Sequence, residues 1–149
     1  MKRIFILSII FFSFITISFS QKKDENVERV KAQKVAFFTE KMNLNCETSQ
    51  QFWPIYNDFF DKKSNLYSQI RTLRHDLNNK MEQLSDEQKN KALNLILKLK
   101  VEGAELEQTY HKRFEKILTT NQLILLYQAE HEFRKKMIDH LHSQSSQSK

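Results

Sequence analysis

Residues 52–77 read FWPIYNDFFDKKSNLYSQIRTLRHDL and include the only Trp and the only Pro of the chain. Two heptad series interleave here: Phe52, Phe59, Leu66 and Leu73 form one, and Tyr56, Lys63, Ile70 and Leu77 form the other. Two such series, offset by four residues, place their side chains on one face of an α-helix. The stretch therefore predicts a long helix with a coiled-coil-like apolar stripe.

Helical spacing recurs on both sides of this stretch, and it predicts a first helix over about 24–42 and a last helix over about 120–142. The region between has two apolar rows: Ile96, Leu99, Gly103, Leu106, Tyr110, Phe114 and Ile117 form one, and Leu93, Leu97, Val101 and Ala104 the other. A helix with two apolar faces must pack in two directions, and a second subunit is one such partner. With one Gly and one Pro, tight β-turns are improbable. We expect an all-α fold of four helices with a long antiparallel hairpin, assembled as a homodimer.

The N-terminus has the layout of a secretory signal. Lys2 and Arg3 precede an apolar run over 4–19, and small residues precede the polar Gln21, which predicts cleavage after Ser20. Retention of this run as a membrane anchor is the alternative, because it is only slightly short of a spanning helix. We expect a signal peptide over 1–20, a single helical domain over 21–142 and a disordered Ser/Gln tail over 143–149.

The composition and the motifs that are missing also argue against several classes of function. The chain carries a formal net charge of +6, but export makes nucleic acid an improbable partner. The single Cys46 cannot form an internal disulfide. No Gly-rich phosphate loop, Cys-x-x-Cys pair or hydrolase motif occurs. We therefore expect a protein that is not an enzyme, with no cofactor and no small-molecule substrate.

Helix starts are marked by capping motifs. In LTTNQL (118–123), Thr119 and Gln122 form a capping box, and Leu118 and Leu123 a hydrophobic staple. In LSDEQ (84–88), Ser85 and Gln88 repeat the box. In LNCET (44–48), Asn45 can cap, but Thr48 cannot return the bond.

On these motifs the chain resembles the periplasmic LTxxQ group, which includes the Spy and CpxP proteins. LTTNQ matches the pattern, LNCETSQQFWPIYNDF is similar to a degenerate first copy, and YQAEHEFRKKMIDHL is similar to the last helix of sensors linked to extracytoplasmic-function sigma factors. The resemblance implies a cradle-shaped antiparallel dimer in the periplasm. It also implies a role as an ATP-independent chaperone, an inhibitor of a signalling protein or a metal sensor.

Candidate binding residues follow from the helical faces. Trp53 and Phe60 are seven residues apart, beside the heptad stripe, and we expect them to form an exposed apolar binding surface. A basic sector lies nearby, comprising Lys62, Lys63, Arg71, Arg74 and Lys80, although an ordinary solvated face is the alternative. Pro54 either bends the helix or starts a new one.

Metal ligation is the other candidate chemistry. Glu107, His111 and Glu115 recur every four residues and lie along one helix face, with His140 and His142 as further donors. The alternative is a hydrated surface with Lys112 and Lys116 nearby.

Our leading hypothesis is an envelope-stress protein that binds unfolded envelope proteins or a membrane-bound regulator. The alternative function is a periplasmic sensor of divalent heavy metals.

Overall fold

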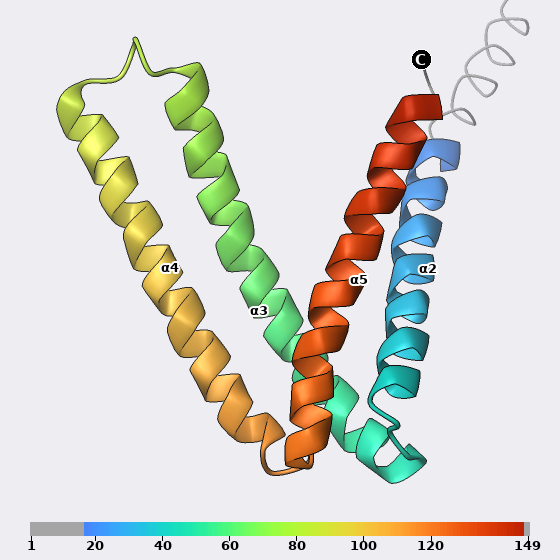
Figure 1. Cartoon of the computed structure of the whole chain (residues 1–149). Helices are drawn as coiled ribbons and strands as arrows, with labels where there is room; N and C mark the ends of the chain where they lie inside the picture. The colour runs from blue at the N-terminus through green and yellow to red at the C-terminus, as the bar shows by residue number, and fades with distance from the viewer. Residues whose placement is uncertain (1–16, 148–149) are drawn as a thin grey trace, which may run out of the picture. The chain divides into compact units, whose positions relative to one another are not determined.

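The computed structural model describes residues 17–147, whose backbone forms four α-helices: α2 (Ile17–Lys41), α3 (Cys46–Asn79), α4 (Asp86–Phe114) and α5 (Thr120–Gln147) (Figure 1). Since these residues contain no strand, the all-α prediction is confirmed. The expected signal peptide falls mainly on residues 1–16, which lie outside the described range. Within that range, no helix combines the length and the apolar character that a membrane span requires.

The helices gather in two compact units. The first unit combines α2 with α5 from Leu126 onward, and the two run antiparallel (Figure 1). Their packing is aromatic: the ring centroid of Phe133 lies 6.0 Å from that of Phe37 and 6.0 Å from that of Phe38. Lys41 forms an ion pair with Glu132 at 2.9 Å beside these rings.

The second unit spans Leu44–Leu125 and is built on the antiparallel hairpin of α3 and α4 (Figure 1). At one end of the hairpin the seam is aromatic, with Phe52, Tyr56, Phe59, Tyr110 and Phe114 all buried. Toward the turn that joins the two helices it becomes aliphatic, with Ile70, Ile96 and Leu99 buried and Leu66, Leu73 and Leu77 packed against them. Both heptad series of α3 therefore face α4, as the spacing predicted.

Hydrogen bonds confirm the predicted helix starts. The Ser85 hydroxyl accepts from the Gln88 amide at 3.2 Å, and the Ser85 amide donates to the Gln88 side chain at 2.9 Å. Thr119 and Gln122 make the equivalent pair of bonds at 3.3 and 3.0 Å. Asn45 caps α3 by accepting from the Thr48 amide at 2.8 Å. Leu118 and Leu123, the expected staple, are both buried.

The structure answers the open question about Pro54, and it extends the last helix beyond its predicted end. Helix α3 runs through Pro54 without interruption, so this residue lies inside a helix and does not start one. Helix α5 continues to Gln147, so the expected disordered tail is helical over 143–147. Neither Gly nor Pro occurs there to end the helix, and Ser and Gln cost little in a helix.

Candidate binding surface on helix α3

An aromatic row lies along the outer face of α3. Trp53, Phe60 and Tyr67 are spaced by seven residues, which keeps their side chains on one side of the helix. Trp53 is half-buried against Phe52 and Tyr56, whereas Phe60 is 44% exposed and Tyr67 is 54% exposed. The row thus begins against the aromatic core and ends in solvent.

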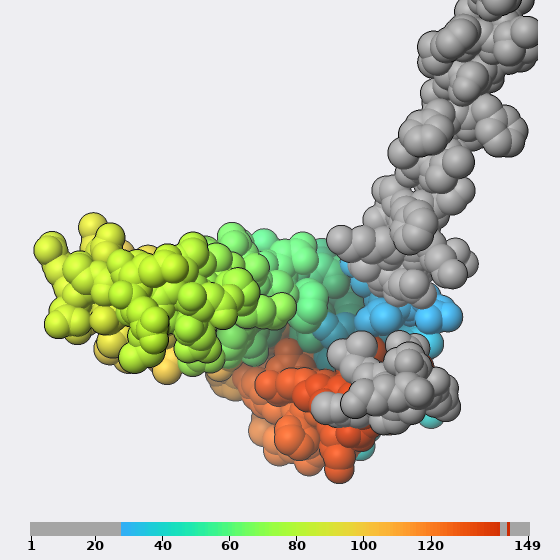
Figure 2. All heavy atoms as spheres, turned by 90° about the horizontal axis from the view of Figure 1, so that it is seen from above, coloured from blue at the N-terminus to red at the C-terminus, as the bar shows by residue number. Residues whose placement is uncertain are grey.

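Tyr67 was missed by the sequence analysis, although its spacing from Phe60 is the same as that between Phe60 and Trp53. In Figure 2 the green atoms of α3 and the yellow-green atoms of the hairpin turn form a continuous surface. We call Trp53, Phe60 and Tyr67, with the two arginines described next, the α3 surface.

Two arginines extend this row toward the turn. Arg71 and Arg74 follow Tyr67 at four and seven residues, so they share its face, and both are exposed. Within the described side chains, neither guanidinium has an ion-pair partner. Their charge is therefore available to an acidic group of a partner.

The other cations of the predicted basic sector lie elsewhere. Lys63 is a seam residue: its side chain is 21% exposed, its ammonium lies 4.9 Å from the centroid of the Phe59 ring, and it pairs with Glu107 at 2.9 Å. Lys62 projects from a different side of α3 and pairs with Asp58 at 2.9 Å. Lys80 follows the last residue of α3 and pairs with Asp76 at 3.0 Å. Of the predicted sector, only Arg71 and Arg74 belong to the α3 surface.

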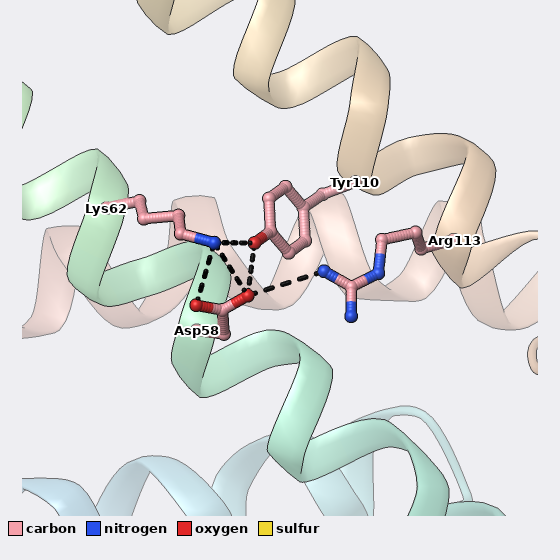
Figure 3. A network of polar contacts seen from close by, with 4 residues as sticks. All are labelled: Asp58, Lys62, Tyr110 and Arg113. Carbon is pink, nitrogen blue, oxygen red and sulfur yellow. Dashed lines mark hydrogen bonds and ion pairs between the residues drawn. The ribbon is translucent and has the colours of Figure 1, made fainter.

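Lys62 instead takes part in a polar network between α3 and α4 (Figure 3). The buried Tyr110 donates its hydroxyl hydrogen to Asp58, and Lys62 donates to the Tyr110 oxygen at 2.8 Å. The Arg113 guanidinium reaches the same carboxylate at 3.4 Å and lies over the Tyr110 ring at 4.7 Å. All four side chains therefore join the two helices of the hairpin.

This network shifts the protonation of its members. The hydrogen bond from Tyr110, followed by that from Lys62, lowers the pKa of the Asp58 carboxyl from 3.8 to about 2. The hydrogen bond with Tyr110 and the contact with Asp58 raise the pKa of the Lys62 ammonium. Both groups are therefore held in their charged forms, so they suit a structural clamp better than proton transfer near neutral pH.

The predicted metal ligands are engaged in other contacts. Glu107 pairs with Lys63, and His111 Nε2 lies 3.2 Å from the Glu115 carboxylate. Among the side chains that the structure describes, no three His, Cys, Asp or Glu residues are grouped so that they could hold a metal ion. The side chain of His142, part of the second suggested donor set, lies outside those described.

Comparisons of this chain with protein-family models, with curated proteins and with solved structures found no match.

Proposed function

We propose that this chain is a non-enzymatic protein of the bacterial envelope that binds partly unfolded polypeptides on the α3 surface. The observation that carries the proposal is the row of Phe60 and Tyr67, both exposed, followed on the same face by Arg71 and Arg74. The signal-like N-terminus and the resemblance of LTTNQ to the LTxxQ motif support the envelope location and the stress-related role.

The chemistry of this face suits chains that have lost their tertiary structure. Such chains expose apolar side chains, and aromatic rings offer large contact areas at little cost in side-chain entropy. The arginines add attraction for net-negative segments, which speeds encounter, while apolar contact slows dissociation. A face with both properties binds many sequences weakly, as an ATP-independent chaperone requires.

A membrane-bound regulator is the alternative occupant of the same face, because an acidic, apolar segment of a folded partner would use the same contacts. The metal-sensor alternative has less support, because Lys63 neutralises Glu107, the first of its three suggested ligands.

Light scattering of a reduced, aggregating client protein tests the proposal. We expect the wild-type chain to suppress aggregation at stoichiometric amounts and the Phe60→Ser, Tyr67→Ser variant to lose most of this effect. The variant Leu97→Ser, Val101→Ser is the matched control, because it removes two exposed apolar side chains from α4 instead. The proposal fails if the folded wild-type chain does not suppress aggregation, or if both variants lose suppression equally.

A further inference from the structure

Helix α4 carries an exposed aliphatic stripe that does not pack against another helix of its unit. Leu93, Leu97 and Val101 recur every four residues, and they are 50%, 58% and 57% exposed. The exposed Ala104 continues the stripe by one turn. The neighbouring Ile96 and Leu99 are buried in the seam with α3, so the stripe is a second apolar face and not the edge of the first. Isolated apolar residues on a surface are ordinary, but three successive ones on a single helix face form a patch.

Lysines border this stripe on both sides. Between Gln88 and Val101 the sequence has four lysines and no acidic residue. With 100° between successive helical positions, Lys89 and Lys100 lie along one border of the stripe, and Lys91 and Lys98 lie along the other. Lys89 pairs with Asp86 at 3.3 Å and Lys98 contacts Glu102 at 3.9 Å, whereas Lys91 and Lys100 have no ion-pair partner among the described side chains.

We propose that the Leu93–Leu97–Val101 stripe of α4 binds the surface of an anionic lipid bilayer. An interfacial helix buries a narrow apolar face at the boundary between headgroups and acyl chains, and it places cations on both sides of that face. Lysine side chains suit these borders, because their alkyl stems lie along the apolar region while the ammonium groups reach the phosphates. The attraction to anionic headgroups adds to the apolar contact.

A second copy of the chain fits this stripe less well. A two-fold interface places the same patch of each subunit against itself, so it would bring the lysine borders of the two copies together. Asp86 and Glu102 offset Lys89 and Lys98, but Lys91 and Lys100 have no ion-pair partner among the described side chains. A peptide helix fits less well too, because such a ligand lies in a groove with two apolar walls. The stripe lies on a single exposed helix face, which a flat surface can contact without a groove.

Flotation with lipid vesicles tests this inference. The full-length chain, as isolated from cells, is mixed with vesicles of phosphatidylglycerol and phosphatidylethanolamine or with vesicles of phosphatidylcholine alone. We expect binding to the anionic vesicles to weaken about tenfold in the variant Leu93→Ser, Leu97→Ser, Val101→Ser. The variant Lys91→Gln, Lys100→Gln should weaken it by a similar factor, and added salt should have the same effect on the wild type.

The controls separate this stripe from the N-terminal apolar run and from the α3 surface. Every variant has the same N-terminus, so any contribution of residues 4–19 to lipid binding is common to all of them. The variant Phe60→Ser, Tyr67→Ser should bind vesicles as the wild type does, which makes failure here distinguishable from failure of the proposed function. Circular dichroism checks that each variant is folded.

Three results would overturn the inference. One is that the wild type binds anionic and neutral vesicles equally and the stripe variant binds both as the wild type does. Another is loss of binding in the α3 variant as well. The last is a wild-type dimer in analytical ultracentrifugation that the stripe variant converts to monomer with vesicle binding unchanged, because a second copy would then be the partner that covers the stripe.

Discussion

Phe60 stacks on Tyr56, one helical turn before it in α3, with their ring centroids 6.4 Å apart and their planes inclined by 19°. Tyr56 is buried in the seam with α4, whereas Phe60 presents much of its ring to solvent. The exposed ring of Phe60 thus packs on a buried core residue, which fixes its position on the surface.

The two rings should respond differently to substitution. Phe60→Ala should lower the free energy of unfolding by about 1 kcal/mol, since it removes one aromatic pair at the surface. Tyr56→Ala should lower it by about 3–5 kcal/mol, because it leaves a cavity among Phe52, Phe59 and Phe114. Urea denaturation measures both values, and similar losses would contradict the division between surface and core.

Removal of the Tyr110 hydroxyl should loosen the hairpin. In Tyr110→Phe the ring stays in the core, but the bonds to Asp58 and Lys62 are lost. We expect the free energy of unfolding to fall by about 1 kcal/mol in urea denaturation. A variant as stable as the wild type would show that solvent replaces these bonds without cost.

The same network predicts a dependence on pH. The folded chain lowers the pKa of Asp58 from 3.8 to about 2, so this carboxylate stabilises the fold fully above pH 3.8 and loses its contribution as the pH falls to about 2. The difference in unfolding free energy between the wild type and Asp58→Asn should therefore shrink as the pH is lowered from about 5 to about 2. Asp86→Asn is a suitable control, because that carboxylate is almost fully exposed, and a constant difference for Asp58→Asn would contradict the assignment.

The contribution of the capping box at the start of α5 to the free energy of unfolding should be measurable on its own. Thr119→Ala removes the hydroxyl that accepts from the Gln122 amide, and we expect it to cost about 1 kcal/mol. Thr119→Ser keeps that oxygen and should restore most of the stability. If the Ser variant is as unstable as the Ala variant, the hydroxyl is not the source of the effect.

Gly103 offers a stabilising substitution. It lies in the middle of α4, and a Cβ atom built there meets no atom within 4 Å beyond its chain neighbours and the adjacent backbone of its own helix. Gly103→Ala should therefore raise the free energy of unfolding by about 1 kcal/mol, because Ala restricts the unfolded chain and favours the helix. Thermal unfolding followed by circular dichroism would show the rise, and a lower midpoint would mean that α4 needs the flexibility of glycine.

Local sequence patterns predicted the helices and their starts well. The heptad positions Phe52, Phe59 and Ile70 are buried, and the bonds of Ser85 and Thr119 form as expected, because both depend on residues a few positions apart in one helix. The place of Lys63 within the predicted basic sector could not be read from local patterns, because it depends on a contact between helices. Lys63 pairs with Glu107, forty-four positions further on, and only the register of α3 against α4 brings the two together.

The change from aromatic to aliphatic packing along the α3–α4 seam makes the hairpin unequal in its two halves. Large rings hold the end near Phe52 and Phe114, whereas smaller side chains hold the half near the turn, where Met81 is exposed. Amide protons close to the turn should exchange with solvent sooner than those around Tyr56, as they do where fewer apolar contacts must break. We therefore expect the hairpin to open first at its turn and last at its aromatic end.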